Sequence, residues 1–261
     1  MVGRNARATI TCTNSMKPGL YIIGTPIGNL EDISARALET LRGANIILAE
    51  DTRHTRILLG RYQIRATLIS CHQFNEASRG PVAIARIQAG QAVALVTNAG
   101  MPGVSDPGAR IVNACRKAGL PVTIIPGPSS VTAAVALCGF IAGGYHCEGF
   151  LPRKEGARKK RIEQLRDAPV PVVMLESPYR CLKVLADLNA LLPERDLFLA
   201  RELTKLHEEC LWGSVTDIYR RLTERHTGDA APALRGEIVM VLAPAGRPKR
   251  ETESSETFDP P

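Results

Sequence analysis

The sequence predicts an α/β protein made of two α/β domains. Short apolar runs alternate with helical patterns over residues 17–126, and strands that alternate with helices imply a mostly parallel sheet with right-handed crossovers. A Pro-Gly-Pro-Ser-Ser bend at residues 126–130 interrupts this alternation, which then resumes. At 261 residues the chain is long enough to bury one large core or two modest ones.

These observations divide the chain into four parts. We expect a flexible N-terminal arm at residues 1–16, a first α/β domain at 17–126, a second at 127–245 and a disordered tail at 246–261. The tail is predicted to be disordered because it is polar, charged and rich in proline.

The first domain is predicted to hold five short strands. Their apolar runs occupy residues 19–23, 46–49, 67–71, 93–96 and 121–125. Helices are expected at residues 32–41, around residues 82–87 and after Asp106. The first of these helices places Ala37, Leu38 and Leu41 on one face.

The second domain is predicted to begin with a helix at residues 131–137, which the two preceding serines can cap. Strand candidates follow at residues 145–150, 170–175, 197–200, 209–212 and 237–242. Helical patterns lie between them at residues 155–167, 178–191 and 214–225. We interpret this half as an α/β domain with a more mixed sheet.

Composition and charge exclude several classes of protein. With 44% hydrophobic and 23% charged residues, the chain has the profile of a soluble globular protein. No apolar stretch approaches the roughly 20 residues that span a bilayer, and the first residues lack the apolar core of a secretory signal. Seven cysteines without a Cys-x-x-Cys pair argue against a disulfide framework or a metal site, and favour a cytoplasmic location. The net charge of +7 is a mild bias toward polyanions.

Polar loops follow three strands of the first domain, at residues 24–32, 50–56 and 97–106. Open α/β sheets bind ligands at the carboxyl ends of their strands. In the third loop Gly100, Gly103 and Gly108 can adopt positive φ. Ser105 and Asp106 are suitable N-cap residues for the next helix, whose first amides would attract an anionic group. The alternative is a tight crossover turn without a ligand.

Charged residues elsewhere form three further candidate sites. Glu50 and Asp51 lie at a strand end beside Arg53, and either a catalytic role or surface ion pairs would explain them. A second polar run, at residues 201–209, contains Lys205. A basic cluster is either a solvated helix face or a contact for nucleic-acid phosphates. It consists of Arg153, Lys154, Arg158, Lys159, Lys160 and Arg161.

Several common catalytic and nucleotide-binding motifs are absent from the sequence. There is no Gly-x-Gly-x-x-Gly fingerprint and no Gly-x-x-x-x-Gly-Lys-[Ser/Thr] loop, so an NAD enzyme or a nucleotide hydrolase is a distant alternative. The sequence also has no His-Glu-x-x-His and no Gly-x-Ser-x-Gly motif, which excludes a zinc protease of that type and a serine hydrolase with that elbow.

Eight segments, in this order, resemble the tetrapyrrole methylase superfamily of S-adenosylmethionine-dependent enzymes. They are GLYIIGTPIGNLEDIS, AEDTRHT, GMPGVSDPG, PGPSS, EGFLPRK, LESPYR, ARELTKLHEE and RGEIV. Within this superfamily, residues 18–243 are similar to the bacterial ribosomal small-subunit RNA methyltransferase I family, which methylates a cytidine 2′-hydroxyl of 16S rRNA. The resemblance implies two α/β domains of the tetrapyrrole methylase type, the cofactor in the cleft between them, and a homodimer.

The resemblance also implies which residues serve the cofactor and the partner. The expected cofactor contacts are Pro26, Asn98, Gly100, Met101, Pro102, Val104, Ser105 and Asp106 in the first domain, with Ser129, Ser130 and Leu175 beyond the bend. A Gly-rich backbone nest would suit the carboxylate of S-adenosylmethionine. The expected partner is 16S rRNA or the small ribosomal subunit, with the basic cluster on its phosphates and neither a metal nor a membrane involved.

Two residues of the third loop depart from the family pattern. The family usually has Asp-Ala-Gly-Thr-Pro, whereas this chain has Asn98 and Met101 at the first and fourth positions. One alternative is therefore a non-catalytic rRNA- or ribosome-binding homologue with a degenerate cofactor loop. The other is a methylase of the same superfamily that acts on a tetrapyrrole.

Methyl transfer to a ribose hydroxyl defines what the catalytic residues would do. The reaction is an in-line displacement at a sulfonium methyl, which requires alignment, and the weakly nucleophilic alcohol benefits from a base. From position and chemistry, Glu50 and Asp51 are candidates for the base. Arg53 and Lys205 are candidates for stabilising the developing charge.

Overall fold

The computed structural model describes residues 16–140, 143–225 and 234–246. The predicted N-terminal arm and C-terminal tail therefore lie almost wholly outside the described residues. The chain divides into two compact units, residues 1–129 and 130–261, three residues beyond the boundary predicted after residue 126. Each unit has a five-stranded sheet of its own. Among the described residues, no helix combines the length and the apolar character needed to cross a membrane.

The first unit is built on a five-stranded sheet with the order β3-β2-β4-β1-β5, and all its neighbouring strands run parallel. Its strands are β1 (Gly19–Ile23), β2 (Ile46–Ala49), β3 (Leu68–Ser70), β4 (Ala92–Val96) and β5 (Val122–Ile125). Its helices are the 3-10 turn η1 (Leu30–Asp32), α1 (Ala35–Gly43), α2 (Thr52–Arg61), α3 (Glu76–Gln88) and α4 (Ala109–Lys117). The predicted parallel sheet is confirmed.

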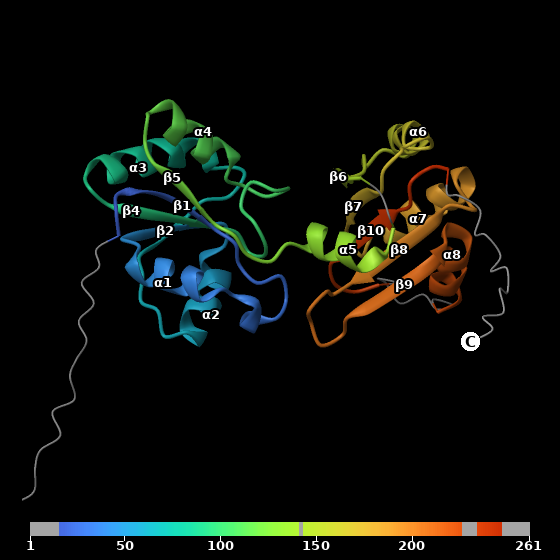
Figure 1. Cartoon of the computed structure of the whole chain (residues 1–261), viewed down its shortest axis with the longest axis horizontal. Helices are drawn as coiled ribbons and strands as arrows, with labels where there is room; N and C mark the ends of the chain where they lie inside the picture. Colours follow the sequence, from blue (N-terminus) through green and yellow to red (C-terminus); the bar gives the residue numbers. More distant parts are fainter. Residues whose placement is uncertain (1–15, 141–142, 226–233, 247–261) are drawn as a thin grey trace, which may run out of the picture. The chain divides into compact units, whose positions relative to one another are not determined.

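Helices cover both faces of this sheet (Figure 1). One face packs Leu41 of α1 and Leu58 of α2 against Ile47 and Ala94 of the central strands. The other face packs the apolar sides of α3 and α4 against alternate residues of the same strands. Since both faces are covered, β2 and β4 are buried along their whole length, and so they form continuous apolar runs in the sequence.

The first predicted helix begins later than its apolar pattern indicated. The helical pattern was expected from residue 32, but the chain forms η1 there and α1 starts at Ala35. Ser34 is the N-cap, and its hydroxyl accepts a hydrogen bond from the Ala37 amide at 3.1 Å. A serine cap satisfies an amide that has no partner inside the helix, so it defines the start of α1.

The second unit has a five-stranded sheet with the order β6-β7-β10-β8-β9. Its strands are β6 (His146–Phe150), β7 (Val172–Glu176), β8 (Asp196–Arg201), β9 (Glu209–Ser214) and β10 (Ile238–Leu242). Its helices are α5 (Ser130–Cys138), α6 (Glu155–Gln164), α7 (Cys181–Leu191) and α8 (Val215–Glu224). Only β6 and β7 pair in parallel among these described strands, so the predicted mixed sheet is confirmed.

One cluster of buried side chains packs α6, α7 and α8 against one face of the second sheet. Met240 of β10 is fully buried and lies in register between Met174 of β7 and Leu199 of β8. Leu185 of α7 and Ile218 of α8 belong to the same cluster and are also fully buried. The strand that comes last in the described chain thus supplies the middle of the sheet.

Candidate active site

The strand order of the first unit brings the three predicted polar loops to one edge of the sheet. Strands β2, β4 and β1 are neighbours and run parallel, so the segments that follow them leave the sheet side by side. Of the loop predicted at residues 50–56, only Glu50 and Asp51 lie outside a helix, because α2 begins at Thr52. This is the edge at which open α/β sheets bind ligands.

Backbone hydrogen bonds join the loop after β1 to the loop after β4. The Thr25 amide donates to the Gly100 carbonyl at 2.9 Å, and the Gly100 amide donates to the Thr25 carbonyl at 3.1 Å. The buried Thr25 hydroxyl also donates to the Thr97 carbonyl at 3.2 Å. Gly100 adopts a φ of 75°, a conformation that glycine accepts without strain. The two loops therefore form one connected substructure.

Two glycines make a close backbone crossing possible beside this pair. A Cβ atom added to Gly24 would lie 2.5 Å from Met101 Sδ and 2.7 Å from Gly127 Cα. The reverse also holds, because a Cβ on Gly127 would lie 2.7 Å from the Gly24 carbonyl oxygen. Neither residue was a predicted site residue, although the GTPIGN and PGPSS segments that contain them were part of the resemblance.

Asn98 links the loop after β4 to the loop after β2. The Asn98 amide donates to Glu50 Oε2 at 3.1 Å, and Asn98 Oδ1 accepts from the Asp51 amide at 3.2 Å. An aspartate at this position would offer the same acceptor oxygen to Asp51. The departure at Asn98 therefore removes a charge while it keeps an oxygen that accepts the bond between the loops.

The carboxylate of Asp51 has a structural role. It caps α2 by accepting from the Arg53 amide at 2.8 Å, and it accepts from the Arg53 guanidinium at 3.2 and 2.8 Å. The hydrogen bonds from the Arg53 side chain and backbone lower the pKa of Asp51 to about 2, while the carboxylate raises the pKa of Arg53. A carboxylate with so low a pKa is a weak proton acceptor, which favours Glu50 over Asp51 as the base.

The start of α4 differs from the prediction. Ser105 and Asp106 were expected to cap this helix, but α4 begins at Ala109 with Gly108 as its N-cap, at a φ of 140°. The buried carboxylate of Glu76 accepts from the amides of Gly108 and Arg110, each at 2.8 Å. The anion that neutralises this helix start therefore comes from α3 of the same chain.

Three of the loop amides that were expected to form an anion nest also have partners within the protein. Besides the pairing of Gly100 with Thr25, the Gly103 amide donates to the Pro107 carbonyl at 3.1 Å and the Val104 amide to the Met101 carbonyl at 3.2 Å. These three amides are therefore not available as a cradle for a ligand carboxylate, and that prediction is corrected.

A pocket of about 340 Å³ opens at the same edge of the sheet. It is lined by residues from the loops after β2, β3 and β4: Glu50, His72, Gln73, Phe74, Ser105, Asp106 and Pro107. His72 and Phe74 were missed as site residues. Their position directly after β3, beside the other strand ends, is the signal that would have found them.

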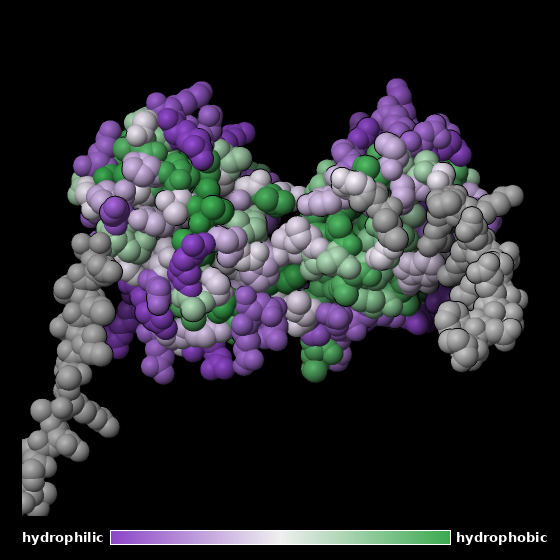
Figure 2. Space-filling view, in the orientation of Figure 1, coloured by the Kyte–Doolittle hydropathy of each residue, from purple (hydrophilic) through white to green (hydrophobic). Residues whose placement is uncertain are grey.

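Half of the basic cluster on and before α6 is neutralised. Arg158 is buried and donates through Nε to Asp187 at 2.6 Å, so it is not available for phosphate contacts. Lys159 pairs with Glu155 at 2.5 Å, and Arg161 donates to both oxygens of Glu148 at 2.6 Å each. Figure 2 shows a hydrophilic surface over α6. Arg153, Lys154 and Lys160 remain exposed, and no ion pair involves them among the described residues.

The remaining predicted residues belong to the second unit or to the junction. Lys205 follows β8, and its Nζ lies 2.8 Å from Glu202 Oε1 and 3.1 Å from Glu237 Oε2. Burial acts to lower the pKa of Lys205, but the hydrogen bonds to these two carboxylates outweigh it and raise the pKa. The other predicted contacts are Ser129 at the end of the first unit, Ser130 at the start of α5 and Leu175 in β7.

Sequence comparison places this geometry in a family. Residues 19–219 match the model of the tetrapyrrole (corrin/porphyrin) methylases. The ribosomal RNA small subunit methyltransferase I of Thermotoga maritima is 42% identical over 86% of this chain and 97% of its own length. The protein of the same name from Mesorhizobium japonicum is 44% identical over 88% of this chain and 76% of its own length. The chain belongs to the ribosomal RNA small subunit methyltransferase I family of tetrapyrrole methylases.

Solved structures of other tetrapyrrole methylases share the fold. The methyltransferase CobJ has a TM-score of 0.62 and 17% identity, over 87% of this chain and 94% of its own. A uroporphyrin-III C-methyltransferase from Thermus thermophilus, solved with S-adenosyl homocysteine, has a TM-score of 0.57 and 17% identity, over 85% of this chain and 96% of its own. The two α/β units are thus the expected tetrapyrrole methylase fold.

The side chains at this end of the sheet suit the positively charged groups of S-adenosylmethionine better than its carboxylate. Glu50 and Asp106 contribute two carboxyl groups to the pocket lining, whereas several nearby amides already have partners. Carboxylates favour the sulfonium and ammonium charges of this cofactor and disfavour its carboxylate. Among the described residues, no group of three or more His, Cys, Asp or Glu side chains is placed to hold a metal ion.

Proposed function

We propose that this protein is an S-adenosylmethionine-dependent methyltransferase that methylates the 2′-hydroxyl of a cytidine ribose in 16S rRNA of the small ribosomal subunit. The observation that carries the proposal is the 42% identity to a ribosomal RNA small subunit methyltransferase I over 97% of that relative. The connected loops at the sheet edge supply a site of matching chemistry.

The proposed cofactor contacts lie in the joined loops of the first unit, with three residues beyond them. They are Pro26, Asn98, Gly100, Met101, Pro102, Val104, Ser105 and Asp106, together with Ser129, Ser130 and Leu175. When bound, S-adenosylmethionine supplies a methyl group on a positively charged sulfur. The loops would hold that group in place and exclude water from it.

The proposed catalytic roles follow from the environments of the side chains. Glu50 accepts the proton of the ribose hydroxyl, since its Oε2 accepts one backbone amide and its carboxylate lines the pocket. Asp51 orients Arg53 and caps α2. Arg53 is exposed and pairs with one carboxylate, that of Asp51, whereas Lys205 is held by two, so Arg53 is the stronger candidate for stabilising the developing negative charge.

The proposed partner is 16S rRNA or the assembled small subunit. Arg153, Lys154 and Lys160 are the members of the basic cluster that remain available for its phosphates. We also propose a homodimer in the cytoplasm. No membrane partner is proposed.

A calorimetric titration of S-adenosylmethionine into the purified protein tests the cofactor assignment. Micromolar binding is expected, because Asn98 keeps the hydrogen bonds that join the loops. Absence of binding at millimolar concentration, in protein shown to be folded, would favour the non-catalytic homologue.

Transfer of a labelled methyl group then tests the substrate. Small ribosomal subunits from cells that lack this methyltransferase should accept the label on a cytidine ribose, and alkaline hydrolysis should leave the modified linkage intact. If the protein binds the cofactor and methylates a uroporphyrinogen instead, the tetrapyrrole alternative holds.

A further inference from the structure

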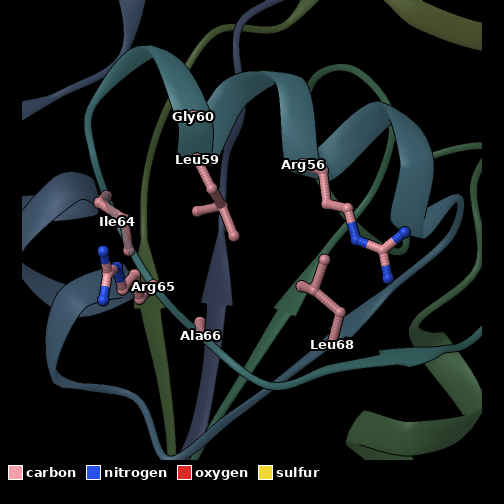
Figure 3. Close-up of a pocket in the computed structure, with 7 residues that line it drawn as sticks. All are labelled: Arg56, Leu59, Gly60, Ile64, Arg65, Ala66 and Leu68. Atoms are coloured by element: carbon pink, nitrogen blue, oxygen red, sulfur yellow. The ribbon is translucent and has the colours of Figure 1, made fainter.

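A hollow of about 330 Å³ lies beside α2, at the edge of the first sheet where β3 is the outer strand. It is lined by Arg56, Leu59, Gly60, Ile64, Arg65, Ala66 and Leu68. Figure 3 shows Arg56 and Arg65 toward opposite ends of the hollow, with Leu59, Ala66 and Leu68 between them. The hollow therefore has an apolar floor bounded by two guanidinium groups.

Neither arginine is neutralised by the described part of the chain. Both are exposed, and no ion pair or side-chain hydrogen bond involves them among the described residues. The surrounding sequence is also one-sided in charge, because residues 52–75 contain four arginines and no aspartate or glutamate. Of the two other arginines in this segment, Arg53 pairs with Asp51 and Arg61 lies 3.9 Å from Glu31.

Helix α2 extends from the proposed active site to the hollow. This helix starts one residue after Asp51, so Arg56 lies roughly 7.5 Å further along its axis at 1.5 Å per residue. A strand of RNA whose target nucleotide lies at the carboxyl ends of the strands would reach the hollow within a few nucleotides.

We propose that this hollow binds a nucleotide of the substrate RNA within a few positions of the methylated one. Arg56 and Arg65 contact its phosphates, and Leu59, Ala66 and Leu68 pack against its base. The inference rests on the proposed function, because it takes RNA as the substrate. RNA is favoured over an acidic protein since a guanidinium pair around an apolar floor matches a phosphate chain that carries flat bases.

The test compares variants of the full chain in their affinity for a short, fluorescently labelled, single-stranded RNA, followed by anisotropy at several salt concentrations. The double variant Arg56→Ala/Arg65→Ala should bind about tenfold more weakly, and the slope of log K against log salt should fall by about 1.4. The matched control is Arg116→Ala/Lys117→Ala, which removes two exposed positive charges from α4 on the other face of the sheet (Figure 1).

A second pair of variants tests the hollow without removing either arginine. A Cβ atom added to Gly60 meets nothing within 4 Å, so the helix can accept a side chain there. Gly60→Glu should weaken RNA binding by placing a carboxylate in the hollow, whereas Gly60→Ala should bind as the wild type does. Affinity for S-adenosylmethionine should remain unchanged in all four variants.

Two results would overturn the inference, and they differ from a failure of the proposed function. The first is RNA affinity of the Arg56→Ala/Arg65→Ala variant equal to that of the α4 control, while the wild type still methylates small subunits. The second is equal competition for the hollow by poly-L-glutamate at matched charge, which would indicate an acidic protein partner. A wild type that binds the cofactor but no RNA would instead reject the proposed substrate, and the inference with it.

Discussion

At the scale of single residues, Glu50 and Asp51 are neighbours in the chain with different environments. Asp51 is fully engaged by Arg53 and by the start of α2, and its pKa is about 2. Glu50 accepts one backbone amide and lines the pocket at the sheet edge. Of these two carboxylates, only that of Glu50 lines the pocket, so Glu50 is the proposed base.

Substitution of each carboxylate separates the two roles. Glu50→Gln should lower single-turnover methyl transfer by about a hundredfold or more, which is the usual contribution of a general base. Asp51→Asn should cost less, because asparagine is also a good N-cap residue. A larger loss for Asp51→Asn than for Glu50→Gln, at equal affinity for S-adenosylmethionine, would contradict this assignment.

Glu148 gives a residue-scale prediction about pH and stability. The side-chain hydrogen bonds from Arg161, followed by that from His146, hold the pKa of Glu148 below its ordinary value of 4.5 in the folded state. A pKa that is lower in the folded state stabilises the fold above the ordinary pKa, and the stabilisation is lost as pH falls through the folded value.

Glu148→Gln should therefore lower the free energy of unfolding at pH 7 by about 1–3 kcal/mol. The difference from wild type should shrink as the pH falls below 4.5. Urea unfolding of the variant and the wild type, at pH 7 and at a pH below 4.5, measures this difference. Glu163→Gln is the control, because Glu163 makes only an exposed pair with Arg166 at 3.7 Å, and it should change little.

At the scale of elements, Glu76 connects α3 to the start of α4 through hydrogen bonds. It belongs to α3, and its buried carboxylate accepts from two amides at the start of α4. Because the loop at residues 97–106 leads into α4, this contact holds one end of the proposed cofactor loop. Glu76 is thus a positioning residue.

Glu76→Ala should leave two amides of the α4 start without their partner. The expected cost is about 1–3 kcal/mol for each buried amide that water does not reach, seen as a lower melting temperature. Affinity for S-adenosylmethionine should also fall, because the loop loses its anchor. Glu39→Ala, at an exposed position of α1, serves as the control. If cofactor affinity in Glu76→Ala stays at the wild-type value, the positioning role is wrong.

Most of the elements followed from the sequence, since their signals are local, but α2 was missed because its first turn was interpreted as a polar loop. Strand β2 matches its predicted residues 46–49, and β4 differs from its prediction by one residue. The start of α4 could not be derived in the same way. Its capping anion is Glu76, which is more than thirty positions away from Gly108 and Arg110 in the sequence.

In the candidate site, too, local signals could be interpreted from the sequence, whereas contacts between distant residues could not. The strand-end rule correctly brought the loops after β1, β2 and β4 together. The basic cluster was misleading for three of its six residues, because a run of cations in the sequence does not reveal carboxylates that are distant along the chain. Arg158 donates a hydrogen bond to Asp187, which lies 29 residues further along the chain. The pairing of Asp51 with Arg53 spans two residues, so local capping chemistry could have revealed it.

At the scale of the whole molecule, the two units have separate apolar cores. The clusters of the first unit and that of the second share no residue. Leu185→Ala removes a fully buried side chain from the second core and should cost about 2–5 kcal/mol. Hydrogen exchange should then accelerate in the second unit while the first keeps its protection. Leu41→Ala should give the reverse pattern, and uniform acceleration would contradict the independence of the two cores.

The central place of β10 has a consequence for the synthesis of the chain. A protein leaves the ribosome from its N-terminus, and the first sheet needs no residue beyond Ile125. The second sheet needs Ile238–Leu242 between β7 and β8, so both strands keep an open edge until this segment has been synthesised. A nascent chain that stalls before this segment would have a complete first sheet, whereas β7 and β8 of the second unit would each have an unpaired edge. Such edges can pair with strands of other chains, so the stalled chain would be prone to aggregate.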